Sequence, residues 1–152
     1  MIIIIKKLFY LFFPLICGSL IGLLISNNID YNSLIKPPLS PPGFIFPIIW
    51  SIIYLLMGIS YLLFKNNYKV TKKESIIYYF QLAVNLLWSI FFFILKWRLF
   101  TIFWTILLLI LVIYLIILFY QKNKISTYLN IPYLLWLIFA TYLTIGVYIL
   151  NN

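Results

Sequence analysis

Charged and apolar positions alternate in long blocks along this chain. The 11 Lys and Arg residues and 2 acidic residues stand at a few short joints, and the charge-free runs between them cover residues 8–29, 37–64, 75–95, 99–121 and 125–152. Each run has at least 21 residues, and a transmembrane helix needs about 20. The pattern predicts an all-α membrane protein with one domain over residues 1–152, a five-transmembrane-helix bundle with helices at 8–27, 44–64, 75–95, 99–120 and 128–150.

The composition agrees with a membrane protein and disfavours several functions. Hydrophobic residues make up 66% of the chain and charged residues 9%, against roughly a quarter charged in soluble domains. There is no histidine, and the only acids, Asp30 and Glu74, lie outside the apolar runs, so acid–base catalysis and proton pumping are disfavoured. Cys17 is the only cysteine, which excludes an intrachain disulfide. We therefore expect no catalytic residue, no metal and no required cofactor.

The positive charges are confined to the joints, which is typical of helix anchoring and not of nucleic-acid binding. With five spans, three cations share one side of the membrane, namely Lys36, Lys96 and Arg98, and the other eight share the opposite side. Because Lys and Arg are enriched in cytoplasmic loops, we expect a cytoplasmic N-terminus. Frequent Ile, Asn and Lys are typical of an AT-rich bacterial genome, so the expected location is a bacterial cell membrane.

The connection at residues 28–43 is longer than the other joints and holds Pro37, Pro38, Pro41 and Pro42. Proline fixes φ and biases the preceding residue away from helix, so the segment should be stiff and extended. Two interpretations stay open at this point: a rigid spacer, or a lid over the bundle, since a long ordered loop among short joints often covers a site.

Polar and aromatic residues recur at helical spacing in three of the predicted helices. These stripes are Trp50, Tyr54, Met57 and Tyr61, then Gln81, Asn85, Trp88 and Phe92, and finally Tyr133, Trp136, Ala140 and Thr144. The amides should face protein or a cavity, because unpaired donors are costly in lipid. The stripes could serve helix packing and the interfacial aromatic belt, or they could line one pocket for a flat hydrophobic ligand.

Gly18 and Gly22 form a GxxxG pattern in the first predicted helix. Such a pattern lets helix backbones approach closely. It would serve either packing within the chain or contact between two copies.

Four blocks of sequence, taken in order, resemble the TspO/MBR family, the tryptophan-rich sensory proteins of bacteria and the translocator protein of mitochondria. The blocks are Lys36-Pro37-Pro38-Leu39-Ser40-Pro41-Pro42-Gly43, Trp50 to Gly58, Gln81 to Trp88 with Phe91 and Phe92, and Pro132 to Leu143. The resemblance covers about residues 8–152 and implies a five-helix bundle, usually a homodimer, that binds porphyrins, haem-related tetrapyrroles, sterols or synthetic aromatic ligands.

The resemblance also assigns roles to residues. By motif match, the residues that line or shape the pocket would be Trp50, Tyr54, Asn85, Trp88, Trp136 and Ala140. The lid would include Lys36, Pro37, Pro41, Pro42 and Gly43. Three positions depart from the family pattern: Leu39 stands where a tryptophan is common, Trp104 where many members have an acid, and Thr144 where many have asparagine.

The combined expectation is an integral membrane receptor or carrier for a tetrapyrrole or a similar hydrophobic aromatic molecule. Apolar burial and aromatic stacking would drive binding. Two alternatives stay open: an enzyme that degrades porphyrin with light or oxygen, and a structural subunit of a larger membrane complex.

Overall fold

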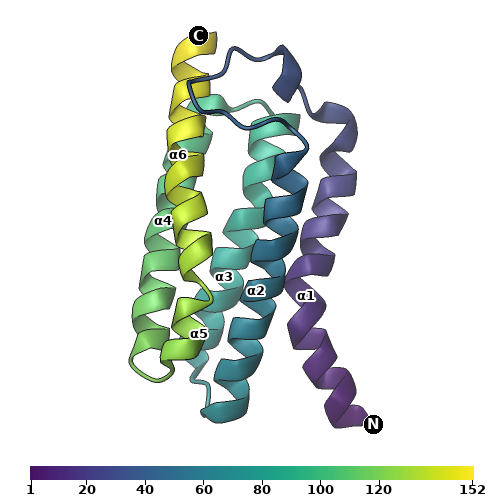
Figure 1. Ribbon diagram of the computed structural model, residues 1–152, viewed down its shortest axis with the longest axis vertical. Helices are drawn as coiled ribbons and strands as arrows, with labels where there is room; N and C mark the ends of the chain where they lie inside the picture. The colour runs from purple at the N-terminus through teal and green to yellow at the C-terminus, as the bar shows by residue number, and fades with distance from the viewer.

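The computed structural model describes residues 1–152, and helices account for nearly all of them (Figure 1). The long α-helices are α1 Ile2–Ile25, α2 Ile45–Asn67, α3 Lys72–Ser89, α4 Arg98–Tyr120 and α6 Ile131–Asn151. A π-helical segment, η3 Ile90–Ile94, continues α3, and a short helix, α5 Lys124–Tyr128, precedes α6. All 5 helical spans are long and apolar enough to cross a membrane. The predicted five-helix membrane fold is therefore confirmed.

Several predicted helix boundaries were wrong. Helix α1 begins at Ile2 and not at residue 8, because Lys6 and Lys7 lie within the helix and do not end it. At two other places, capping side chains extend helices into the charged joints. Helix α3 begins at Lys72, before the predicted 75, since the Thr71 N–H donates to Glu74 Oε2 at 2.7 Å and the Glu74 N–H donates to Thr71 Oγ1 at 3.3 Å. This reciprocal capping box satisfies two amide donors at the helix start. Likewise, Asn123 Oδ1 accepts from the Ile125 N–H at 3.0 Å and so begins α5 inside the predicted loop 121–127.

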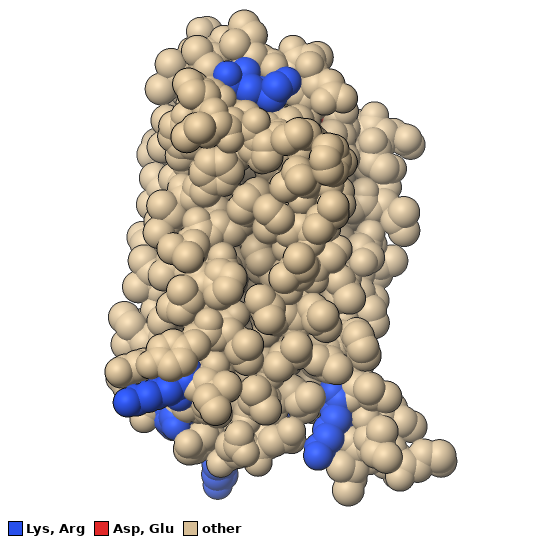
Figure 2. All heavy atoms as spheres, in the orientation of Figure 1, with Lys and Arg blue, Asp and Glu red and all other residues tan.

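The bundle has two ends that differ in charge. Most of the lysines lie at the end that holds the N-terminus, here called the Lys-rich end, and a smaller cluster lies at the opposite end, here called the loop end (Figure 2). Figure 2 shows no Lys or Arg atoms on the visible middle of the molecule. The middle is therefore the apolar band that would face lipid.

Helix α1 packs along α2, and glycines make this contact close. A Cβ added at Gly58 would overlap the backbone carbonyl of Leu11, and one added at Gly18 would overlap the ring of Tyr54. Gly22, by contrast, has nothing within 4 Å of an added Cβ. Half of the GxxxG pattern therefore serves packing within the chain, while Gly22 leaves open space on the surface of α1.

Stacked aromatic rings fill the core of the Lys-rich half. Tyr61 of α2 stacks on Tyr78 of α3 with ring centroids 3.9 Å apart, and Phe64 of α2 stacks on Phe119 of α4 at 4.1 Å. All four side chains are fully buried. Since α2 and α4 end here and α3 begins here, this half of the bundle closes around a dry core.

The connection between α1 and α2 crosses the loop end to α6 and then returns to α2 (Figure 1). It contains two short turns, η1 Ser26–Asn28 and η2 Tyr31–Ser33, followed by the proline-rich stretch. The side chain of Asn151 in α6 pairs with the Ile35 backbone: Oδ1 accepts from the N–H at 3.0 Å, and Nδ2 donates to the carbonyl at 2.8 Å. The connection is thus fixed to the last turn of the chain.

Candidate ligand site

The sequence-predicted site residues Trp50, Tyr54 and Asn85 come together in the middle of the bundle. Trp50 stacks on Tyr54 one turn later in α2, with centroids 5.5 Å apart. Trp50 also meets Tyr133 of α6 edge-on at 6.2 Å. The Tyr54 hydroxyl donates to Asn85 Oδ1 of α3 at 2.6 Å. Three helices thus contribute to one aromatic and amide cluster.

Hydrogen bonds continue from this cluster as a relay. Asn85 Nδ2 donates to the Tyr133 hydroxyl at 2.8 Å, and that hydroxyl donates to Gln81 Oε1 at 2.9 Å. Gln81 Nε2 lies 3.4 Å from the sulfur of Met57 and donates to it. The amides are buried and face protein, as the sequence predicted. Because the donors and acceptors of the relay bind each other, its first role is to join α2, α3 and α6 in a medium that offers no water.

Tyr133 and Gln81 were missed as site residues, although both lie in the predicted stripes. Their signal was polarity on a helix face that already held Asn85 or Trp136. Sequence alone did not show that a phenol from the last helix would stand between two amides of α3.

Trp136 lies on α6 beside an apolar groove between α2 and α6. The groove has a volume of about 400 Å³, and its walls are Ile49, Ile52, Ile53, Pro132, Leu135, Trp136 and Phe139. The indole ring meets Phe46 of α2 edge-on at 5.8 Å. Its Nε1–H is buried without a hydrogen-bond partner. A buried donor left unpaired costs about 1–3 kcal/mol, so this N–H is the free polar group of the site.

Trp88 lies apart from the other predicted tryptophans. Its ring stacks on Phe92 at 4.8 Å and packs with Leu34 and Val147 in a small cluster under the connection. Its Nε1–H donates to Thr105 Oγ1 of α4 at 2.7 Å. Trp50 and Trp136 pack instead against the main core. The structure therefore divides the predicted aromatic set between two clusters.

Ala140 is half-buried one turn above Trp136 on α6. Its carbonyl accepts from the Thr144 hydroxyl at 2.7 Å, so Thr144 spends its donor within its own helix. Trp104, another departure from the family pattern, donates its Nε1–H to the Val84 carbonyl at 2.7 Å and joins α4 to α3. An acid at this position could not make that bond.

The predicted lid residues form a braced cap at the loop end. Lys36 Nζ donates to the carbonyls of Tyr31 and Leu34, each at 3.1 Å, and the Tyr31 hydroxyl donates to the Pro41 carbonyl at 2.7 Å. Partial burial raises the pKa of Tyr31, so the phenol stays protonated and able to donate. Pro37 is buried against Gly146 of α6, where an added Cβ would lie 2.6 Å from the proline ring.

Aromatic contacts connect the cap to the groove. The Tyr31 ring meets Phe46 edge-on at 5.0 Å, and Phe46 in turn meets Trp136. Gly43 stands between Tyr31 and the start of α2, where a Cβ would lie 3.5 Å from the tyrosine ring. Pro42 accepts the Ile45 N–H at 3.0 Å and so starts α2. Leu39 is exposed with a left-handed φ of 66°, so the residue that replaces the family's tryptophan points away from the site.

No group of three His, Cys, Asp or Glu side chains lies close enough together to hold a metal ion. Stacked aromatic rings, an apolar groove and one unpaired N–H suit a flat apolar molecule that carries a hydrogen-bond acceptor.

Comparison with known proteins identifies relatives of this chain. The sequence profile of the TspO/MBR family matches residues 10–150. The chain is 36% identical to "Tryptophan-rich protein TspO" of Archaeoglobus fulgidus over 122 residues, which cover 80% of this chain and 79% of the relative. It is 32% identical to "Translocator protein homolog" of Schizosaccharomyces pombe, with 91% and 87% covered.

A third relative is "Tryptophan-rich sensory protein" of Cereibacter sphaeroides, which is 30% identical over 144 residues, 87% of this chain and 84% of the relative. The family match at residues 10–150 includes the cap and at least part of every helix described above. With its five membrane-spanning helices, this chain is an integral membrane protein, and it belongs to the TspO/MBR family.

Proposed function

We propose that this protein is a membrane receptor or carrier that binds a tetrapyrrole or a similar flat hydrophobic aromatic molecule between α2 and α6, beneath the proline-rich cap. The observation that carries the proposal is the buried, unpaired Nε1–H of Trp136 beside an apolar groove of about 400 Å³. Ligand pockets occupy about 300–1,000 Å³ and combine apolar walls with few polar groups. A carbonyl or carboxylate of the ligand would accept the free N–H.

The names of relatives supply secondary support. "Tryptophan-rich sensory protein" describes the Cereibacter sphaeroides relative as a sensor, and "Translocator protein homolog" describes the Schizosaccharomyces pombe relative. Both names fit a protein that holds a small molecule without transforming it. The homodimer implied by the family resemblance stays a prediction.

Titration of protoporphyrin IX into the protein in mild detergent, followed by its Soret absorbance, tests the proposal. Trp136→Phe keeps an apolar ring but removes the N–H, and we expect it to weaken binding by about 1–2 kcal/mol, roughly 5–30-fold. Its stability should change little, because removal of the unpaired buried donor offsets the smaller apolar area of phenylalanine. Ala140 does not itself line the groove, but Ala140→Phe would put a ring one turn from Trp136 on α6 and should abolish binding in a folded protein.

Trp88→Phe is the matched control. Trp88 donates to Thr105, so this variant should lose about 1 kcal/mol of stability and keep its affinity. Unaltered affinity in Trp136→Phe, together with an unfolded Ala140→Phe, would show that the α6 face serves packing alone. Mass spectrometry of the porphyrin after illumination separates a receptor, which returns it intact, from a degrading enzyme.

We further propose that the Lys-rich end faces the cytoplasm, because Lys and Arg are concentrated there. Ser33 and Asn67 are exposed at opposite ends. In a Cys17→Ser background, an impermeant maleimide applied to intact cells should label Ser33→Cys and not Asn67→Cys. The reverse labelling pattern would invert the orientation.

A further inference from the structure

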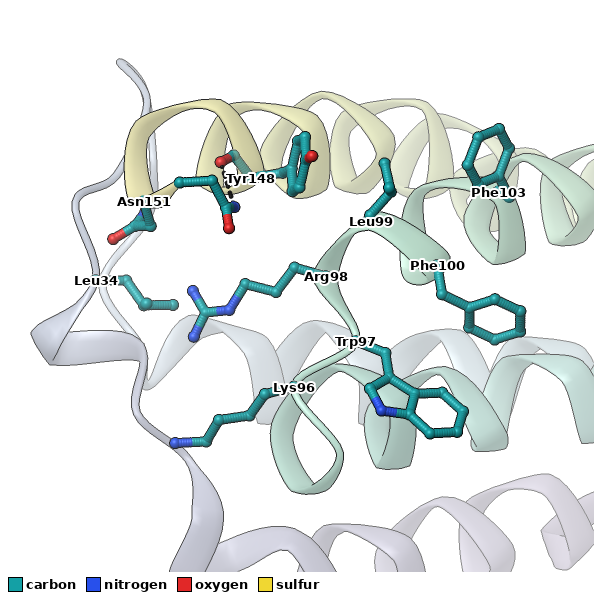
Figure 3. Close-up of a pocket in the computed structure, with 10 residues that line it drawn as sticks. Leu34, Lys96, Trp97, Arg98, Leu99, Phe100, Phe103, Tyr148 and Asn151 are labelled. Carbon is teal, nitrogen blue, oxygen red and sulfur yellow. Dashed lines mark hydrogen bonds between the residues drawn. The ribbon is translucent and has the colours of Figure 1, made fainter.

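A larger cleft opens at the loop end, on the side of the bundle formed by α4 and α6 (Figure 3). Its volume is about 910 Å³. It is lined by Leu34, Lys96, Trp97, Arg98, Leu99, Phe100, Phe103, Tyr148, Asn151 and Asn152. None of the residues proposed to bind the tetrapyrrole belongs to this cleft. The cleft is therefore a separate candidate site.

Two cations at the start of α4 share one carboxylate in this cleft. Arg98 Nη2 lies 3.0 Å from Asp30 Oδ2, and Lys96 Nζ lies 3.3 Å from the same oxygen. In Figure 3 the side chains of Arg98, at the start of α4, and of Lys96, in the turn before it, extend toward the connection that holds Leu34. The guanidinium has five N–H donors, and one of its nitrogens, Nη2, already donates to Asp30. One positive charge and several donors are left for a ligand.

The wall below these cations is apolar. Leu99, Phe100 and Phe103 are exposed on the first turns of α4, inside the membrane-spanning segment. Trp97, which is 53% exposed, lies beside them at the helix start. The cations lie at the loop end, and the exposed apolar wall lies next to them within the membrane span. This arrangement suits an amphiphile with an anionic head group. A free inorganic anion would leave the apolar wall unused.

The backbone turn at Lys96 positions one of these cations. Lys96 has a φ of 55°, and it follows the end of the helix, where the Leu95 N–H donates to the Ile90 carbonyl and the Trp97 N–H to the Phe91 carbonyl. Glycine is the usual residue at such a left-handed helix end, so a lysine is strained there. The turn places the Lys96 side chain among the residues that line the cleft.

We propose that this cleft binds an anionic phospholipid, with the phosphate against Lys96 and Arg98 and an acyl chain along Leu99, Phe100 and Phe103. The start of α4 adds to the attraction, because no side chain caps it and its first turn has no acidic residue, so the positive end of its dipole is free. The bound lipid would brace α4 against the connection through Leu34.

The test uses the full-length protein in phosphatidylcholine bilayers and Trp97 as the reporter. Brominated phosphatidylglycerol, an anionic lipid, and brominated phosphatidylcholine are titrated separately, and the quenching lost in Trp97→Phe is the signal from the cleft. We expect half-maximal quenching at a several-fold lower mole fraction of the anionic lipid at low salt. Equal quenching by the two lipids would overturn the proposal.

Two variants give predictions of opposite sign. Lys96→Gly removes a cation and relieves the backbone, so the preference for the anionic lipid should fall at least threefold while thermal stability holds or rises. Asp30→Asn removes the competing carboxylate, so the preference should increase. Lys69→Gly is the matched control, since it deletes an exposed lysine at the Lys-rich end and should leave the preference unchanged.

Inorganic phosphate at constant ionic strength separates a lipid from a soluble anion. We expect no displacement of the brominated lipid by phosphate. Displacement by phosphate, or an unchanged preference in both Lys96→Gly and Asp30→Asn, would contradict a lipid site. Porphyrin affinity should be unaltered in all these variants. A negative result for the lipid site would therefore not count against the proposed receptor function, which has its own test.

Discussion

The two halves of the bundle are built from the same helices but packed in different ways. In the Lys-rich half, stacked rings such as Tyr61 on Tyr78 are fully buried. In the loop half, Trp50, Trp88 and Trp136 are only partly buried, and both described hollows border this half. The comparison shows that one half holds the helices together while the other keeps surface for ligands.

The relay from Tyr54 through Asn85 and Tyr133 to Gln81 marks the boundary between the halves. Below it, short connections join α2 to α3 and α4 to α5, and Ser60 of α2 donates to the Ser126 carbonyl of α5 at 2.7 Å. Above it, α2 and α6 meet through aromatic edges. The relay can therefore be regarded as the floor of the ligand-binding half.

The largest expected effect comes from the close contact of α1 with α2. Gly58→Ala places a Cβ against the Leu11 carbonyl, and a backbone atom cannot move aside as a side chain can. We expect a loss of about 3 kcal/mol in the free energy of unfolding, measured by denaturant titration in detergent micelles.

The same substitution at Gly22 is the control for Gly58. Nothing lies within 4 Å of an added Cβ there, so Gly22→Ala should stabilise the protein by about 0.5–1 kcal/mol through helix propensity. Similar losses at both glycines would contradict the described packing of α1. A loss at Gly22 alone would point to a second copy that covers its face.

The second prediction concerns the relay that forms the floor of the ligand-binding half. Asn85→Leu leaves the Tyr54 hydroxyl buried without its acceptor, and we expect a loss of about 1–3 kcal/mol in the free energy of unfolding. Adding Tyr54→Phe removes the unpaired hydroxyl, so the double variant should regain at least part of that loss. Strictly additive losses in the same denaturant titration would show that the two side chains do not depend on each other.

The smallest effect is expected at the cap. Asn151→Ala removes both bonds to Ile35, which should raise amide hydrogen exchange at Ile35 roughly 2–10-fold and leave the global unfolding free energy nearly unchanged. Asn152→Ala is the control, because Asn152 donates only to the Tyr148 carbonyl of its own helix. Unchanged exchange in Asn151→Ala would mean that other contacts, such as Pro37 against Gly146, fix the cap alone.

Much of the fold could be predicted from the sequence, because uninterrupted apolar runs of this length have few alternatives in a membrane. The helix ends at Lys72 and Lys124 were missed, since a charge-free run marks the lipid-facing part of a helix and not its hydrogen-bonded ends. The capping residues Thr71 and Asn123 carried the missing information.

The candidate site was predictable only within each helix. Helical spacing placed Trp50 with Tyr54, and polarity placed Asn85 inside the bundle, but the distance between two stripes depends on how the helices rotate about their axes. Trp88 lies on the regular part of α3, one turn nearer the loop end than Asn85, and it faces Thr105 and the underside of the connection. The π-helical turn at Ile90–Ile94 comes after it, and no proline or glycine in this segment predicts that turn.

The bond between Asn151 and Ile35 joins residues 116 positions apart, which sets an order on the protein's biosynthesis. Chains are made at roughly 5–20 residues per second, so α1 and α2 can pair in the membrane on the order of ten seconds before their connection finds its anchor. Tyr142, which donates to the Pro38 carbonyl, is also made late. The cap therefore cannot be anchored before the last turn of α6 is made, and a nascent chain halted before α6 would have neither the anchored cap nor the groove between α2 and α6.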